Sequence, residues 1–293
     1  MRTISSVAPF ALAMTLVLGA PAVLAQDAPP EPLDSTPDPW TIKFEPNAWY
    51  VATSGNIALP GSAGSGNGST FSVATLNLDS PRLSPLGELQ LRRGDWRINA
   101  QGLGFSTDDR SSVRLGSGQI GDAPYSAGDT LRSSIDLFIF AVDGAYALHT
   151  YETGILDSGQ PKFRATLLAL AGVRAIDASV DAQVFGPGAS LPSATAGGNG
   201  FNAHPYAGLR GEMDIYEDFT IDLLGSVGGF SLGESQSWSA DIMVGFQWNP
   251  TPHFGAQIGY RRLLFGIERG EAPTEFAWNG SLAGVYVGAT LRF

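Results

Sequence analysis

The sequence predicts an all-β fold, a transmembrane antiparallel up-and-down β-barrel of about ten strands, with eight or twelve strands as alternatives. Three observations support it: an export signal at the start, strands that alternate apolar and polar residues over a membrane-spanning length, and connections that alternate between short turns and long loops. Each strand of such a barrel turns one apolar face to lipid and one polar face to the lumen. The mean hydropathy of +0.04 fits this balance.

Residues 1–25 have the features of a secretory signal peptide. A basic residue, Arg2, precedes an apolar run at 7–18, and the small residues Val23 and Ala25 occupy the −3 and −1 positions before the expected cut. The apolar run is too short to span a bilayer comfortably, so an uncleaved anchor is the less favoured alternative. The chain contains no cysteine, which excludes a lipid anchor on a cysteine after the cut.

The remaining chain divides into a tether and one large domain. Residues 26–39 are proline-rich and acidic, which is typical of a segment that joins no core. Residues 40–293 then form the barrel, with outer-membrane lipid as its surroundings. The formal net charge of −11 and the lack of a Lys/Arg run argue against a nucleic-acid partner.

The clearest strand runs from Ser237 to Asn249, where apolar residues occupy every second position and the positions between them are polar or small except Met243. Period two over this length indicates a strand. Its apolar face begins with Trp238 and ends with Trp248. Ten steps of about 3.3 Å, tilted by about 40°, rise roughly 25 Å, which matches the lipid-facing band of a barrel between its aromatic girdles.

The chain ends on a strand of the same kind. Apolar residues occupy every second position from Ala283 to Phe293, and small or polar residues lie between them. A terminal Phe on such a strand resembles the signal that the bacterial barrel-assembly machinery reads. We therefore expect Phe293 to engage that machinery and, with Trp238 and Trp248, to belong to the aromatic girdle.

Other strands follow with weaker alternation. They are expected near 88–92, 96–101, 163–174, 206–215, 219–227 and 254–262, whereas 42–58 and 131–148 are ambiguous. In the last of these, Asp136 and Asp143 have opposite parity, so one of them must lie outside the apolar band.

The connections predict the orientation. Tight turns are expected at 93–95, 216–218 and 249–252, and long loops rich in Gly, Ser, Pro and Asp at 59–80, 107–129, 184–203 and 268–280. Two connections depart from this pattern, a short link near 231–236 and a longer turn at 149–161. Short periplasmic turns and long outer loops are typical of a membrane barrel with both termini in the periplasm.

Two stretches carry a family likeness. The first is Trp40 followed by Phe44-Glu45-Pro46-Asn47-Ala48-Trp49-Tyr50. The second comprises Gly228-Gly229-Phe230, Ser237-Trp238, Val244-Gly245-Phe246 and Gly259-Tyr260-Arg261-Arg262-Leu263. From about residue 40 to the C-terminus the chain resembles a class of proteobacterial outer-membrane barrels of unknown function. The resemblance implies the fold and a Gram-negative outer membrane, and it implies no activity.

The predicted lumen face gathers charges of both signs. Buried Arg and carboxylate groups must pair to avoid a desolvation cost of several kcal/mol. We therefore expect a cluster of Arg210, Asp222 and Asp241 on three successive strands, together with Glu212 and Arg261. Barrels of about eight strands are filled by side chains, while open channels need about sixteen. This favours a lumen mostly plugged by paired charges, with a narrow conduit for small solutes as the alternative.

Catalytic and cofactor signatures are missing from the sequence. Of its three histidines, His149 and His253 fall in expected turns and His204 has inward parity near the outer rim. No His has a Ser or acidic residue placed as its nucleophile partner, and no metal or phosphate motif occurs. We expect a non-enzymatic barrel without cofactor that serves envelope structure or surface contact, with an extracellular ligand left open. A barrel hydrolase is the third alternative.

Overall fold

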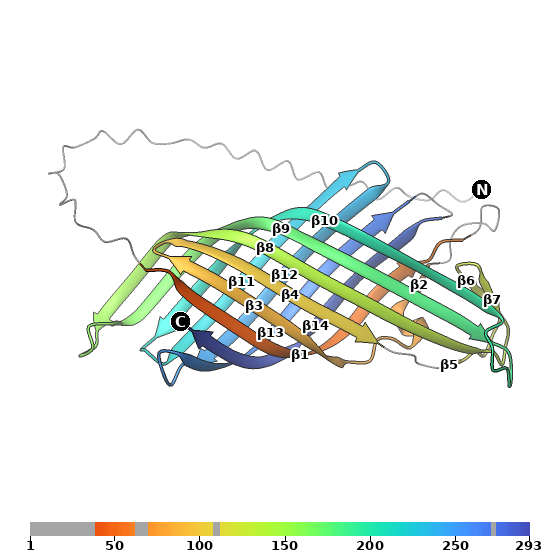
Figure 1. The fold of residues 1–293 in the computed structure, drawn as a ribbon, viewed down its shortest axis with the longest axis horizontal. Helices are drawn as coiled ribbons and strands as arrows, with labels where there is room; N and C mark the ends of the chain where they lie inside the picture. The colour runs from red at the N-terminus through yellow and green to blue at the C-terminus, as the bar shows by residue number, and fades with distance from the viewer. Residues whose placement is uncertain (1–38, 62–69, 108–111, 271–273) are drawn as a thin grey trace. The chain divides into compact units, whose positions relative to one another are not determined.

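The computed structural model describes residues 39–61, 70–107, 112–270 and 274–293. The predicted signal peptide and nearly all of the tether therefore lie outside the described residues. Within the described residues, ten long antiparallel strands form one closed ring, which confirms the predicted fold (Figure 1). Each strand pairs with its neighbour along the chain, and the last strand pairs with the first from Lys43↔Arg292 to Ala58↔Ala277.

The ring strands differ greatly in length. They are β1 (Thr41–Ala58), β3 (Arg82–Arg93), β4 (Trp96–Thr107), β8 (Thr130–Ile155), β9 (Pro161–Phe185), β10 (Ala194–Ile215), β11 (Phe219–Leu232), β12 (Ser235–Trp248), β13 (Phe254–Arg269) and β14 (Phe276–Arg292). Short elements lie in the connections: β2 (Thr70–Ser72), the 3-10 helix η1 (Val73–Leu76), β5 (Ser112–Val113), β6 (Gly118–Ile120) and β7 (Ala123–Tyr125).

The alternation of β12 places its side chains as predicted. Ile242 and Val244 on the outward face are 58% and 48% exposed, whereas Ser239 and Asp241 on the inward face are 1% and 0% exposed. Both tryptophans that bracket the strand also face outward. The same parity holds on β14, where Val285 and Val287 face outward, so the apolar stripe is a lipid-facing surface.

The two ends of the barrel are unlike. At one end, which we call the turn end, lie Thr41, Arg292 and short connections such as Gly94-Asp95, where Gly94 adopts the left-handed φ of +55° that a tight hairpin requires. The turn at 156–160 is shorter than the predicted 149–161 because β8 and β9 extend into it. The opposite end, the loop end, carries the remaining connections.

Two predicted loops at the loop end are wrong in extent. Residues 184–203 were expected as a loop, but β9 continues to Phe185 and β10 starts at Ala194, which leaves 186–193 between them. Likewise 268–280 shortens to 270–275 because β13 and β14 extend. The small residues that suggested loops are in fact strand residues whose lack of bulk allows close packing on the inner face.

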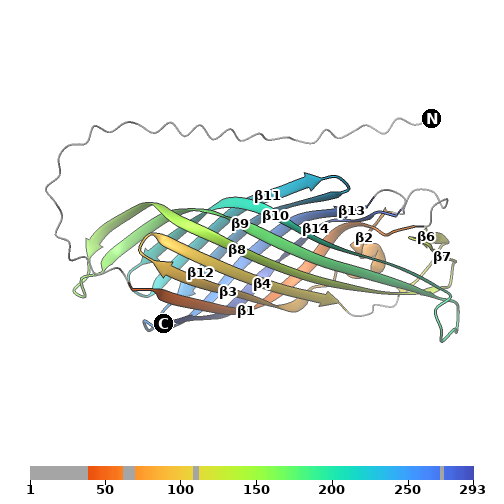
Figure 2. The ribbon, with the colours of Figure 1, turned by 45° about the horizontal axis from the view of Figure 1, so that its top comes forward.

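As a result, β8, β9 and β10 project beyond their neighbours at the loop end (Figures 1 and 2). The strand β8 begins at Thr130, five residues before its pairing with β4 starts at Ile135, and at the turn end it continues for nine residues past Tyr146. Asp136, opposite Ser106 of β4, is exposed on the outward face and Asp143 is buried in the lumen, so the two carboxylates have opposite parity, as predicted.

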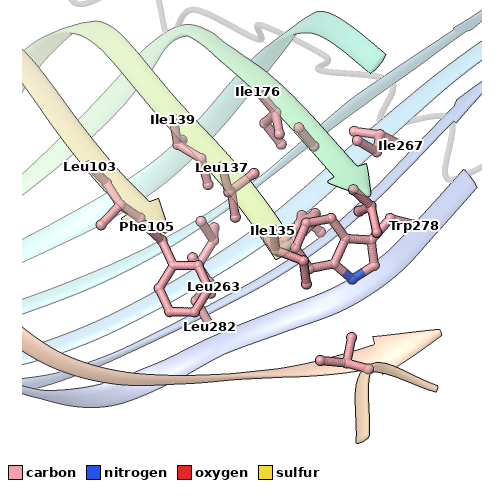
Figure 3. Close-up of a cluster of buried hydrophobic side chains, with 14 of the residues drawn as sticks. Leu103, Phe105, Ile135, Leu137, Ile139, Ile176, Leu263, Ile267, Trp278 and Leu282 are labelled. Atoms are coloured by element: carbon pink, nitrogen blue, oxygen red, sulfur yellow. The ribbon is translucent and has the colours of Figure 1, made fainter. Parts of the chain in front are cut away.

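The main hydrophobic core occupies the loop half of the lumen. Inward side chains from β4, β8, β9, β13 and β14 converge there (Figure 3), and Phe105, Phe265 and Trp278 are at most 2% exposed. Phe265 and Trp278 meet edge to face with ring centroids 5.0 Å apart. The core therefore lies inside the barrel, and the lipid-facing surface is a second, outer apolar layer.

Candidate functional site

The turn half of the lumen holds a charge cluster centred on Arg210. Its Nε donates to Asp222 Oδ1 at 3.0 Å, its Nη2 bonds the other oxygen of the same carboxylate, and its Nη1 lies 2.5 Å from Glu88 Oε1. Glu212 lies 3.4 Å from Arg210 Nε and forms its own ion pair with Arg97. This fork-to-carboxylate geometry uses the guanidinium donors that a Lys would lack.

A second cluster lies nearer the loop end and is centred on Asp241. Arg174 Nη2 approaches Asp241 Oδ2 at 3.0 Å, and Arg261 donates to both oxygens at 3.0 and 2.5 Å. Arg261 also donates to Gln101 at 2.7 Å. The Arg174 guanidinium carbon stands 4.6 Å over the ring of Tyr206. All these groups are buried.

The prediction that Arg210, Asp222 and Asp241 form one cluster is therefore wrong for Asp241. The register places Glu212 opposite Asp222 but places Asp241 opposite Ser226. Four residues along β11 separate Asp222 from Ser226, a distance of about 13 Å at the usual strand rise. The predicted set thus divides into Arg210, Asp222 and Glu212 in one cluster and Asp241 and Arg261 in the other.

Sequence reasoning missed the partners of two further buried carboxylates, Asp143 and Glu45. Asp143 accepts a hydrogen bond from Tyr206 at 2.7 Å and another from Asn99 at 2.7 Å. Near the turn end, Glu45 accepts one from Gln247 at 2.8 Å and meets Lys43 at 3.0 Å. Their inward parity was the available signal, but β1 and β8 are the strands whose alternation was ambiguous.

His204 lies between two serines, which the sequence did not predict. Its Nδ1 is 2.8 Å from Ser237 Oγ and its Nε2 is 2.7 Å from Ser239 Oγ, and Arg174 donates to that second hydroxyl at 2.7 Å. Cross-strand packing of β10 against β12 brings them together. Because His204 is 0% exposed and both serines are 1% exposed, solvent does not reach this group, and the contacts are those of a satisfied interior histidine.

The loop half of the lumen was expected to carry paired charges and instead is apolar. Its inward side chains are aliphatic or aromatic, and the set includes Leu103, Phe105, Ile135, Leu137, Ile139, Ile176, Leu263, Phe265, Ile267, Trp278 and Leu282. The prediction of a plug of paired charges therefore describes only the turn half. Runs such as Leu263-Leu264-Phe265, apolar on both faces of one strand, were the signal in the sequence.

A packed contact across the lumen closes the loop end. Gly198 and Gly200 on β10 face Phe276 so closely that a Cβ on Gly200 would lie 2.9 Å from the ring. Leu59 and Pro60, which follow β1, also pack against Gly198. The extension of β8–β10 is thus joined to the β14–β1 side through side chains that fill the space left by two glycines.

At the turn end the lumen opens into a cavity of about 750 Å³, which we call the vestibule. Basic and acidic side chains both line it, among them Lys43, Arg92, Arg164, Arg292, Glu212, Asp214 and Asp222. Its inner end therefore meets the Arg210 cluster, beyond which the apolar core begins.

The aromatic residues predicted for the girdle all face outward. Trp238, Trp248 and Phe293 are 38%, 49% and 73% exposed. The backbone of Phe293 also exchanges hydrogen bonds with Ile42 at 2.9 and 3.1 Å, so the last residue closes the seam between β14 and β1 at the turn end.

Among the described residues, no three His, Cys, Asp or Glu side chains lie close enough together to hold a metal ion. Within the same part of the chain, no helix has the length and apolar character needed to cross a membrane.

Solved structures with a similar fold are outer-membrane proteins. The outer membrane protease OmpT from Escherichia coli aligns over 90% of this chain and 99% of its own, with a TM-score of 0.53 and 13% identity. Neisserial surface protein A covers 87% of this chain and 97% of its own at a TM-score of 0.32 and 10% identity. Ail, the attachment invasion locus protein of Yersinia pestis, covers 86% of this chain and 99% of its own, with a TM-score of 0.31 and 9% identity.

No family model matches the chain, and no curated protein matches it. At such low identities the likeness to OmpT establishes the fold of an outer-membrane β-barrel and nothing about activity.

Proposed function

We propose that this protein is a non-enzymatic, closed outer-membrane β-barrel that acts through its surface at the loop end and does not conduct solutes. The observation that carries the proposal is the apolar core in the loop half of the lumen. Phe105, Phe265 and Trp278 fill that half and are at most 2% exposed. A water-filled path needs a polar lumen, and a hydrophobic constriction excludes water and ions.

The turn half supports the same proposal. Arg210, Arg174 and Arg261 each bond a carboxylate directly, at side-chain exposures of 8% or less. Charges in a conducting pore would be hydrated, whereas these are satisfied by each other. Among the described residues, the vestibule is the opening that the conduit alternative would use, and its lining reaches Glu212 and Asp222 of the Arg210 cluster.

We also propose that the turn end faces the periplasm and the loop end faces the outside of a Gram-negative cell. Short turns on the periplasmic side and longer loops outside are the usual arrangement. We further propose that residues 1–25 are removed on export, and that Phe293 at the seam is read by the barrel-assembly machinery. Outer-membrane lipid then surrounds the apolar stripe that contains Val244 and Val285.

Conductance in planar bilayers tests the closed lumen. The purified protein, inserted at increasing protein-to-lipid ratios, is expected to give no ion-conducting steps, while an open porin in the same bilayers serves as the positive control. Stable single-channel steps from the native protein would overturn the proposal and favour the conduit.

The non-enzymatic part of the proposal has a separate test. His204 holds both serines at hydrogen-bond distance but is sealed from solvent. A screen for peptide and lipid ester cleavage is expected to find no activity that differs between the native protein and His204→Ala. Cleavage by the native protein that the variant loses would favour the hydrolase alternative.

A further inference from the structure

The longest unpaired strand edge in the described part of the barrel belongs to β10. On one side β10 pairs with β9 along its whole length, from Ala194↔Val184 to Ile215↔Phe163. On the other side it pairs with β11 only from Tyr206 to Ile215. Above Tyr206 the β11–β12 hairpin separates from β10 (Figures 1 and 2), while β12 stays paired with β13 up to Ser235↔Arg269.

The other unpaired stretches at the loop end are shorter, and several of them are covered or protected. The strand β2 pairs with β1 at Asn56–Ala58, and β5 pairs with β8 at Thr130 and Leu131. A shorter open stretch of β3 contains Pro85, which has no N–H to donate. Covering strands, charges and Pro are the devices by which proteins protect edges from pairing with other chains.

The open edge of β10 runs from Ala194 to Pro205, and apart from Pro205 at the end next to Tyr206 it has none of these devices. Residues 194–201 read Ala-Thr-Ala-Gly-Gly-Asn-Gly-Phe, without charge and without Pro. Eight residues of strand extend for about 26 Å, and about every second residue turns both its N–H and its C=O to the open side. This is the main-chain pattern to which an extended peptide adds as a further strand.

The edge is also held rigid from inside the barrel. Phe276 packs against Gly198 and Gly200. Asn202 Nδ2 donates to the carbonyl oxygen of Gln236 at 3.3 Å and to that of Glu268 at 3.5 Å. Because these contacts fix the strand before any partner arrives, strand addition would not have to order it.

The outward face beside this edge is acidic. The neighbours of β10 on β9 are Asp177 opposite Phe201, Ser179 opposite Asn199 and Asp181 opposite Gly197. The Asp181 carboxylate lies so close over Gly197 that a Cβ there would be 2.7 Å from Oδ1. Since Gly197 has no side chain, a long basic side chain on an added strand could cross it and reach Asp181. These outward carboxylates also place the segment above the lipid-facing band.

A second copy in the same membrane does not fit this edge. Two copies inserted in the same direction are related by an axis along the membrane normal. Strands tilted by about 40° would then cross at about 80° instead of lying side by side. The occupant that fits is therefore a segment of a different chain.

We propose that an extended, basic peptide segment of another protein adds as a strand to β10 at Ala194–Phe201, with a Lys or Arg over Gly197 paired to Asp181. This deepens the surface-contact role proposed above by naming its partner class, and it rests on that role.

The test uses the full protein in lipid nanodiscs and a synthetic blocked peptide of about eight residues that alternates Thr and Arg. Two sister peptides carry Gln or Glu in place of Arg. We expect the Arg peptide to bind, with its amides protected from hydrogen exchange at alternate positions. The Gln peptide should bind more weakly, on the order of fivefold, as expected for losing partly exposed ion pairs, and the Glu peptide should not bind.

Two variants and a control locate the site. Asp181→Asn should remove most of the preference for the Arg peptide over the Gln peptide. Gly197→Lys should abolish binding because a charged side chain at the edge opposes pairing with another strand. Asp136→Asn, a change of another exposed outward carboxylate on β8, should leave binding unchanged. Any one of the following results would overturn the inference. The Arg peptide does not bind, the Glu peptide binds equally well, or binding is retained in Gly197→Lys. Amide protection that does not alternate along the peptide, or self-association of the barrel through residues 194–201, would have the same effect.

These results separate the two proposals. A barrel that does not conduct and does not bind the peptide would retain the closed-lumen proposal and remove the strand-addition site. A barrel that conducts would remove the closed-lumen proposal whatever the peptide does.

Discussion

Replacing Arg210 with Ala is expected to be one of the most damaging single changes in the lumen. Arg210 is 2% exposed and holds Asp222 by a two-point contact and Glu88 by a third, with Glu212 at 3.4 Å. Its removal leaves buried carboxylates without their cation. Removing one partner of a buried ion pair costs about 3–5 kcal/mol, so the free energy of unfolding should fall by about that amount.

The assay is equilibrium unfolding in urea from lipid vesicles, followed by tryptophan fluorescence. Arg164→Ala is the matched control because Arg164 pairs with Glu152 at 2.7 Å but both side chains are partly exposed, at 31% and 49%. That change should cost no more than about 1 kcal/mol. The triple variant Arg210→Met, Glu88→Gln and Asp222→Asn should recover most of the loss because it removes the stranded charges.

The same variants distinguish a packed interior from a hydrated one. In a hydrated lumen, Arg210→Ala would cost less than about 1 kcal/mol and would change ion conductance. That pair of results would refute the assignment of Arg210 to a buried, mutually satisfied cluster.

Three further outcomes are expected. Val244→Arg should destabilise the barrel by about 2–4 kcal/mol in vesicles because Val244 faces lipid, and an unfolding free energy equal to that of the parent would show that the outward parity is wrong. Deleting Phe293 should slow or reduce insertion because it removes both the seam contact with Ile42 and the C-terminal signal. Heat-modifiable gel mobility measures the inserted fraction, and full insertion of the deletion variant would contradict the role proposed for Phe293. Gly200→Val should lower the free energy of unfolding by about 1–3 kcal/mol because the new side chain would collide with Phe276. Gly211→Ala is the control and should be tolerated, since the nearest atom to the added Cβ is 3.9 Å away. Equal unfolding midpoints for the two variants would contradict the packed loop end.

The sequence predicted the features that depend on one strand at a time. On β12 from Ser237 to Trp248, each outward position is apolar and each inward position except Met243 is small or polar, so parity alone placed Trp238, Asp241 and Trp248. The tight turn at Gly94 was predictable for the same reason, since its residues act locally. The count of ten ring strands followed from these parts.

Features that need two strands together were harder to predict. The split of Asp241 from Asp222 comes from the pairing register, which the turn at 216–218 does not fix beyond β11. Residues 194–201 looked like a loop because Gly is poor in isolated strands. Their glycines make room for Phe276, which comes from the far side of the lumen and about 75 residues later in the chain.

The apolar loop half was missed because alternation disappears where both strand faces are apolar. On β13, Leu263 and Phe265 face the lumen while the outward face carries Leu264. A period-two pattern then gives no signal, and the run can be read as either face. Only the convergence of five strands shows that this surface is the core of the molecule.

Cysteine accessibility tests the central claim of a sealed lumen most directly, because the native chain contains no cysteine. Ala178→Cys places one thiol in the apolar loop half with little change in volume, at a position 1% exposed, and Gln160→Cys places one at the vestibule. In intact barrels, a small charged thiol reagent is expected to label Gln160→Cys quickly and Ala178→Cys only after unfolding. Rapid labelling of Ala178→Cys in the folded protein would show that water reaches the loop half and would contradict the closed barrel.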